Sequence, residues 1–230
     1  MAKLIDIPEA NYERPKPKEV LEFNHTYRFY PDKQFQGIIL PTFSNKQEQN
    51  ATKNADKTQI LLLSGKAGSG KNTFGDMLKK ELGNKDKKVL MLAYADYLKF
   101  ICYTYFGWDG KKDKKGRTLL QIKGDEITIV DKNFFVDIVI DLIKVLYSKY
   151  DFFIVTDARF KNEILEIKRQ FKNVKSIRIV RPNFKTTLTK EQQRHKSEVE
   201  LDYFNFNHYI ENNSLEGLKQ TANEFVKFYL

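Results

Sequence analysis

From residue 58 onward, short apolar runs alternate with stretches whose apolar residues recur at helical spacing. Gln59–Ser64 is a mostly apolar run of the kind found in buried parallel strands. The segment Lys71–Leu82 then spaces its apolar residues at helical intervals, and the pair Gly83-Asn84 ends that helix. This succession predicts the first strand and the first helix of an α/β domain.

The same alternation continues to the C-terminus. An amphipathic helix is predicted where Phe135, Val139 and Ile143 share one side and Asp137 and Asp141 lie on the other. Strands that alternate with helices predict a parallel sheet covered on both faces. Further strands are predicted at 88–93, 151–156, 174–180 and 208–211, and further helices at 163–171 and from an N-cap at Ser214 to about 229.

The first 57 residues have a different character. Two short strands are conceivable at 26–30 and 37–40, and the polar stretch 44–57 has no periodicity and resembles a linker. We therefore interpret 1–57 as an N-terminal extension and linker, and 58–230 as the main domain.

Two segments interrupt the regular rhythm of the main domain. One is a long insert at 95–149, and the other is a polar, basic segment at 183–200. Extra segments at the ends of strands are where a doubly wound sheet builds its ligand site.

A glycine-rich loop between the first strand and the first helix carries the clearest chemical signal. The spacing Gly65-x4-Gly70-Lys71 is that of a phosphate-cradling loop. Glycines let successive amides point inward at one anion, and the following helix adds its N-terminal amides and dipole. Lys71 would bring a positive charge to the outer phosphates. The residues predicted to bind ATP here are Gly65, Lys66, Ala67, Gly68, Ser69, Gly70, Lys71, Asn72 and Thr73.

The loop departs from the strict pattern at one position. Asn72 follows the lysine where Ser or Thr is usual, and Thr73 comes one place later. This form of the loop resembles that of the nucleoside monophosphate kinases, adenylate kinase among them. The resemblance favours a small-molecule kinase over a motor or a GTPase, and it makes Thr73 a candidate for contact with Mg²⁺.

Two charged residues follow the strand predicted at 151–156. Asp157 would face the phosphates and hold Mg²⁺ or its waters, or it would merely cap a turn. Arg159 would clamp an acceptor phosphate with its planar fork, or it would form an ion pair with Glu163, four residues on. Both alternatives stay open for each residue.

The remaining candidates lie in the interrupting segments. Arg181 and the basic segment after it, which includes Arg194, would suit a mobile cover over a phosphoryl-transfer site, although a solvated loop would look the same. Asp96 and Lys99 share one face of a predicted helix, and acceptor binding explains them no better than a surface ion pair does.

Composition adds few constraints. The 230 residues are 41% hydrophobic, which is enough for a proper core, and the net charge of +10 comes from scattered lysine pairs that suit either an anionic partner or a solvated surface. The single cysteine, Cys102, excludes an internal disulfide. No run of 18 apolar residues occurs, so we expect no membrane span and a cytoplasmic protein, in the host cytoplasm if a phage encodes it.

Taken together, these motifs resemble the bacteriophage deoxynucleoside monophosphate kinases, and more distantly other small P-loop kinases such as phosphomevalonate kinase. The resemblance covers about 58–230, and its pieces occur in the order of that family. They are the loop Gly65–Thr73, Ala95-Asp96-x-x-Lys99, Gly116-Arg117-x-Leu119-Leu120-Gln121, Asp157-x-Arg159-Phe160-x-Asn162-Glu163, Arg181-Pro182, His195-x-Ser197-Glu198 and Ile210-x-Asn212.

The resemblance implies an α/β P-loop NTPase fold in three layers, with a five-stranded parallel sheet of order 2-3-1-4-5. It makes 95–149 the acceptor-binding insert and 183–198 the lid. It also implies roles for single residues. The catalytic residues would be Lys71, Asp157, Arg159, Arg181 and Arg194. The residues that bind the acceptor would be Asp96, Lys99, Arg117, Gln121 and Arg159. Asn212 would lie near adenine, and Thr73 and Asp157 would bind Mg²⁺, directly or through water.

The function that these predictions support is ATP- and Mg²⁺-dependent phosphorylation of a deoxynucleoside monophosphate. The same fold acting on another phosphorylated metabolite or on a nucleoside is the main alternative. A nucleic-acid-binding module that uses the positive charge is disfavoured because its phosphate loop would be idle. The expected partner is thus a small molecule and neither a membrane nor a nucleic acid, and a homodimer is left open.

Overall fold

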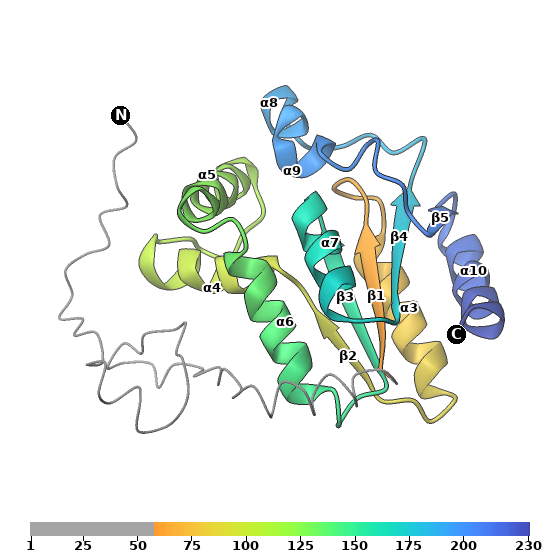
Figure 1. Cartoon of the computed structure of the whole chain (residues 1–230). Coiled ribbons are helices and arrows are strands. Elements are labelled where there is room, and N and C mark those ends of the chain that lie inside the picture. Colours follow the sequence, from red (N-terminus) through yellow and green to blue (C-terminus); the bar gives the residue numbers. More distant parts are fainter. Residues whose placement is uncertain (1–57) are drawn as a thin grey trace, which may run out of the picture.

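The computed structural model describes residues 58–230. The expected extension at 1–57, with its strands at 26–30 and 37–40 and its linker at 44–57, lies outside the described residues. In the described part, a twisted parallel sheet is covered by helices on both faces (Figure 1).

The sheet has the predicted topology. Its order is β2-β3-β1-β4-β5, and every neighbouring pair is parallel. The α/β P-loop fold with strand order 2-3-1-4-5 is therefore confirmed. The strands are β1 (Gln59–Ser64), β2 (Val89–Leu92), β3 (Phe152–Ala158), β4 (Val174–Val180) and β5 (His208–Glu211).

Eight helices occur in the described residues. The insert predicted at 95–149 contains three of them, and the segment predicted as a loop at 183–200 contains two short ones. They are α3 (Lys71–Gly83), α4 (Ala95–Tyr105), α5 (Lys114–Val130), α6 (Phe134–Leu146), α7 (Lys161–Gln170), α8 (Lys190–Arg194), α9 (Lys196–Val199) and α10 (Leu215–Phe228). None of the described helices is both long and apolar enough to cross a membrane.

Both faces of the sheet are buried, which explains why β1 reads as a continuous apolar run. Ile60 and Leu62 pack into a cluster with α6 and α7, whereas Leu61 and Leu63 pack into a second cluster with α3 and α10. All four are fully buried. The central strand is thus fixed from two sides, and the loop that follows it starts from a rigid point.

The prediction that Asp141 lies on an exposed, polar side of α6 is wrong, because this residue is only 9% exposed. The helix contacts α4 and α7, and its buried residues Val136, Val139, Ile140 and Ile143 extend over more than one stripe. A helix enclosed in this way buries part of the face that its sequence marks as polar.

The carboxyl ends of the strands meet at one edge of the sheet. In Figure 1 the loop after β1 lies at this edge, with α8 and α9 above it and α5 to one side. Strand β3 continues two residues beyond its predicted end at 156, so that Asp157 lies within the strand.

Candidate active site

A cavity of 580 Å³ lies at the carboxyl edge of the sheet, between the glycine-rich loop, the insert and the segment 181–198. Most of the predicted site residues line it, which brings together parts of the chain far apart in sequence. They are Ala67, Gly68, Gly70, Lys71, Asn72, Thr73, Lys99, Arg117, Gln121, Asp157, Arg159, Arg181 and Asn212.

Five predicted site residues do not line this cavity. Lys66 and Ser69 line a neighbouring hollow of 360 Å³, and Gly65 lies at the base of the loop. Asp96 is exposed and bonds with Lys99 at 2.6 Å, so the two share a helix face as expected. Arg194 is exposed at the end of α8. Its catalytic role stays a prediction, and it requires a movement of α8.

The loop is curled, as a phosphate cradle must be. Gly65 and Gly68 have φ angles of +153° and +79°. A Cβ atom at Gly65 would lie 2.4 Å from the carbonyl oxygen of Ile179, and one at Gly68 would lie 2.1 Å from the ring of Phe184. The backbone conformation favours glycine at both positions, and at Gly65 the nearby backbone oxygen leaves no space for a side chain.

Lys71, the first residue of α3, bends back over the loop. Its Nζ donates to the carbonyl oxygens of Gly65 (2.6 Å) and Lys66 (2.9 Å), and the residue is only 7% exposed. Burial and the charge of Arg159 lower the pKa of Lys71 to about 7, although the carboxylates of Glu198 and Asp157 act in the opposite direction.

The lowered pKa predicts that nucleotide binding takes up a proton. At pH 8 most of the free protein has a neutral Lys71, and a bound polyphosphate would raise its pKa and restore the charge. Calorimetry in buffers of different ionisation enthalpy should give an uptake of about one proton at pH 8 and almost none at pH 6. Equal proton uptake at pH 6 and pH 8 would contradict a neutral Lys71 at pH 8.

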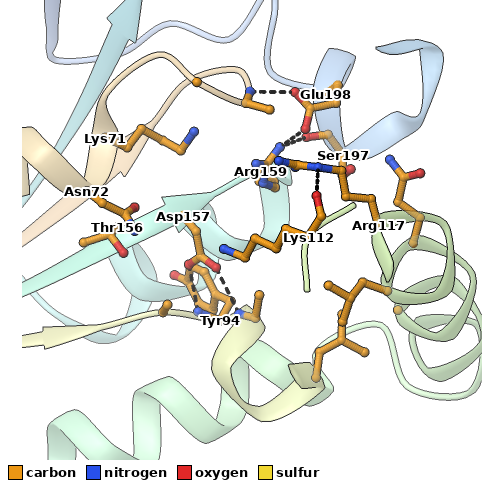
Figure 2. Close-up of a pocket in the computed structure, with 18 of the residues that line it drawn as sticks. Lys71, Asn72, Tyr94, Lys112, Arg117, Thr156, Asp157, Arg159, Ser197 and Glu198 are labelled. Carbon is orange, nitrogen blue, oxygen red and sulfur yellow. Dashed lines mark hydrogen bonds and ion pairs between the residues drawn. The ribbon is translucent and has the colours of Figure 1, made fainter. Parts of the chain in front are cut away.

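Asp157 anchors the start of the insert to the sheet. Its Oδ1 accepts the N–H of Tyr94 (2.8 Å) and its Oδ2 accepts the N–H of Ala95 (3.0 Å), at the beginning of α4 (Figure 2). Burial raises the pKa of Asp157, and these two N–H groups oppose the shift. The capping alternative is thus observed, although between β3 and α4 rather than in a local turn. Contact with Mg²⁺ stays a prediction.

Glu163 does not form the ion pair with the Arg159 side chain that was one alternative. Its Oε2 accepts the backbone N–H groups of Arg159 (2.5 Å) and Phe160 (2.9 Å), which caps the start of α7. Burial raises the pKa of Glu163 to about 8, and the nearby Asp157 raises it as well. This carboxyl group therefore fixes the backbone of Arg159 and leaves its guanidinium group to other partners.

The guanidinium group of Arg159 contacts the lid segment. It forms an ion pair with Glu198 and donates to the carbonyl oxygen of Ser197 (3.1 Å). The other carboxylate oxygen of Glu198 accepts the N–H of Ala67 in the glycine-rich loop (2.9 Å), and Figure 2 shows both contacts. Sequence reasoning named Glu198 only as part of a motif, and gave it no role.

Lys112 completes a group of cations that the sequence only partly revealed. The side chain points toward Asp157 in Figure 2, and Arg117 Nε donates to the Lys112 carbonyl oxygen at 2.8 Å. Partial burial and the charges of Lys99 and Arg117 lower the pKa of Lys112. Together with Arg159, these residues form what we call the acceptor cluster: Lys99, Lys112, Arg117 and Arg159.

A rigid turn presents Lys112 to the cavity. Trp108 Nε1 donates to the carbonyl oxygen of Lys111 (2.9 Å), and a Cβ atom at Gly116 would lie 2.1 Å from that oxygen. In the sequence, Lys112 was one of several scattered lysine pairs. Its position five residues before Arg117 was the only available signal.

Arg178 is a second residue that the sequence did not reveal. It lies on β4 and is 8% exposed, and it donates to Ser64 Oγ (3.0 Å) and to Asp202 (2.8 Å). Asp202 also pairs with Lys66 at 2.9 Å. Burial lowers the pKa of Arg178, and Asp202 opposes the shift. Nothing in the sequence of β4 distinguishes this buried charge, which bonds to Ser64 just before the glycine-rich loop.

The segment 183–198 docks on the insert. Gln192 donates to the carbonyl oxygen of Lys114 and to Thr118 Oγ1, both at 3.1 Å. His195 Nε2 lies 3.0 Å from Asp125 Oδ2 on α5, and Gln121 Nε2 donates to the Gln192 carbonyl oxygen at 3.4 Å. His195 therefore has a hydrogen-bonding partner on the insert.

Two predicted nucleotide contacts also support the loop. Asn212 Nδ2 donates to the carbonyl oxygen of Ser69 (2.9 Å), and the residue is 7% exposed. The guanidinium group of Arg181 lies 4.7 Å from the ring of Phe184, and its Nη1 donates to the carbonyl oxygen of Gly68 (3.4 Å). Contact of Asn212 with adenine stays a prediction.

Comparison with known proteins gives similarity in structure only. No protein-family model matches the chain, and no curated protein matches it. A mutant of the Mycobacterium tuberculosis APS kinase CysC is 9% identical, and the match covers 74% of this chain and 98% of that chain with a TM-score of 0.41. The same kinase in complex with AMPPNP and APS is also 9% identical, and the match covers 74% of this chain and 96% of that chain with a TM-score of 0.41. The protein APE1195 is 15% identical, and the match covers 76% of this chain and 97% of that chain, again with a TM-score of 0.41.

Proposed function

We propose that this protein is a kinase that transfers the terminal phosphate of ATP to a deoxynucleoside monophosphate. The observation that supports it best is that two groups of residues suited to bind anions line one cavity. The curled loop with Lys71 forms the first, and the acceptor cluster with Lys112 forms the second. Asp157 lies beside the end of the Lys112 side chain, below Lys71 in the view of Figure 2.

The second site suits a phosphorylated acceptor with a flat, partly apolar body. Its cations would bind the phosphate of the acceptor. Leu98, Leu120 and Phe135 line the same cavity and offer apolar walls for a base, and Gln121 offers an amide that could contact the edge of that base. In this proposal, 95–149 is the acceptor-binding insert and 183–198 is the lid.

The reaction needs little covalent chemistry from the protein. An oxygen of the acceptor phosphate attacks the γ-phosphorus of ATP, the bond from that phosphorus to the β-phosphate oxygen breaks, and ADP leaves. The attacking oxygen is already ionised, so no general base is required. Lys71, Arg159 and Arg181 would stabilise the charge on the phosphoryl group, and a closed lid would exclude water.

The donors present fit a magnesium ion that arrives with ATP. The described residues contain no cluster of three or more His, Cys, Asp and Glu that could hold a metal ion alone. Mg²⁺ in kinase sites needs only one or two protein ligands, because phosphates and waters complete its shell. Thr73 and Asp157 line the cavity and would provide them. When bound, the ion would neutralise charge on the β- and γ-phosphates.

A panel of acceptors tests the proposal. The full chain is incubated with MgATP and with each deoxynucleoside monophosphate, ribonucleoside monophosphate or nucleoside, and ADP is measured. The cations of the acceptor cluster favour phosphorylated acceptors, so we expect ADP with at least one deoxynucleoside monophosphate and none with nucleosides. If ADP forms only with a different phosphorylated metabolite, the proposed acceptor is wrong but the kinase activity stands. If no acceptor gives ADP, the proposed kinase activity is wrong.

The same assay tests the second anion site through Lys112. Lys112→Ala should raise the KM for the acceptor about tenfold and leave the KM for ATP nearly unchanged, because one charge–phosphate contact is lost. Lys111→Ala is the matched control, since its side chain is 75% exposed and pairs with Asp109. Equal KM values for the two variants would exclude Lys112 from acceptor binding.

A further inference from the structure

Glu198 lies between the guanidinium group of Arg159 and the glycine-rich loop. Its side chain is 7% exposed, one oxygen pairs with Arg159, and the other accepts the N–H of Ala67 from the loop. The charge of Glu198 also acts on Lys71 and Arg178, where it opposes the burial that lowers their pKa values. The carboxylate therefore lies in a ready-made anion site.

The partners of Glu198 are those that an outer phosphate of a nucleotide requires. A phosphate in the loop takes the inward-pointing amides, and Lys71 reaches its outermost groups. Arg159, on the acceptor side, would contact the phosphoryl group in transit. Two anions cannot share these donors without strong repulsion in a buried site. The side chain of Glu198 and the third phosphate of ATP would therefore compete for the guanidinium group of Arg159.

We propose that Glu198 stands in for the terminal phosphate of ATP in the nucleotide-free protein, and that its displacement by that phosphate lets the site distinguish ATP from ADP. The proposal rests on the proposed function. ADP has no third phosphate, so it leaves the ion pair of Glu198 with Arg159 intact. ATP removes this ion pair and releases the guanidinium group of Arg159 for the reacting phosphates.

The position of Glu198 on α9 links this exchange to the lid. Ser197 precedes it and bonds both to Arg159, through its carbonyl oxygen, and to His195, through its hydroxyl group at 2.9 Å. His195 in turn contacts Asp125 on α5. A displaced Glu198 therefore changes the contacts of the lid with both the loop and the insert.

Nucleotide affinity measures this role directly. Glu198→Gln retains the size of the side chain and an oxygen for the Ala67 N–H, but it has no charge to oppose a phosphate. We expect the Kd for AMPPNP to fall about tenfold, a typical size for such coupling, and the Kd for ADP to change less than about twofold. Glu200→Gln is the matched control, because Glu200 only accepts the N–H of Lys161 (2.8 Å).

Three results for Glu198→Gln would overturn the proposal. They are no change in either Kd, an equal gain in affinity for both nucleotides, and a weaker affinity for AMPPNP. Binding of AMPPNP by the wild-type protein keeps the proposed function intact in all three cases. Failure of the wild-type protein to bind either nucleotide would refute the proposed function itself, and this inference with it.

A second measurement uses the wild-type chain, so that it does not depend on the folding of a variant. Hydrogen exchange of peptides that cover 195–200 and the loop at 65–70 is compared in the free, ADP-bound and AMPPNP-bound states. The proposal expects the ADP state to resemble the free protein at 195–200 and the AMPPNP state to differ from both. Identical exchange at 195–200 with the two nucleotides would contradict displacement of Glu198.

Discussion

Lys71→Ala should lower the turnover of ATP by about a thousandfold, the scale of losing one preorganised charge at the transferring group. Lys71 is buried beside the loop that would hold the phosphates, and its Nζ bonds only to the carbonyl oxygens of Gly65 and Lys66 in the described structure. A bound triphosphate would replace these carbonyl partners. The measurement is a coupled assay of ADP formation with saturating acceptor.

The matched control for this variant is Lys79→Ala. Lys79 lies on the same helix, α3, but it is exposed and does not line the cavity. It should retain full turnover, since it changes the net charge by the same amount at a distance from the site. Near-normal transfer by Lys71→Ala would end the case for a phosphoryl-transfer loop at 65–73.

Asp157→Asn should have the second largest effect, with turnover lower by about a hundredfold and a loss of about 1–3 kcal/mol in the free energy of unfolding. An asparagine offers one oxygen and one amino group, so only one of the N–H groups of Tyr94 and Ala95 would keep its acceptor. The variant also loses the negative charge next to the phosphates. Urea unfolding and a Mg²⁺ titration of the activity separate the two effects.

Asp151→Asn provides the comparison for stability alone. Asp151 lies just before β3, at the opposite end of the strand, and its Oδ2 accepts the N–H of Lys88 at 2.8 Å. A similar backbone bond is thus weakened far from the cavity, and turnover should stay normal. If both variants lose stability and neither loses turnover, Asp157 is a structural anchor only.

Local signals explain why the fold and the loop could be predicted. The alternating strands and helices depend on hydrophobic periodicity within each segment, and Gly65–Thr73 carries its whole phosphate motif in nine consecutive residues. The strand order came from a resemblance rather than from periodicity. The structure confirms that order.

Long-range contacts explain what the sequence could not reveal. Glu198 acquires its role from Ala67, which is 131 residues away, and Arg159 pairs across 39 residues rather than with Glu163, four residues on. Arg178 is buried within β4 because its charge is satisfied by Ser64 and by Asp202 from another segment. No pattern within a single element encodes such pairings.

The two hydrogen bonds that Asp157 accepts at the start of α4 also limit how the proposed kinase could be redesigned. Because one carboxylate joins β3 to the insert, a substitution that moves Tyr94 or Ala95 in order to admit a larger acceptor would also move Asp157. Side chains on α5, such as Leu120 and Gln121, line the same cavity without this attachment. Acceptor selectivity should therefore be altered first on α5, where specificity and chemistry can vary independently.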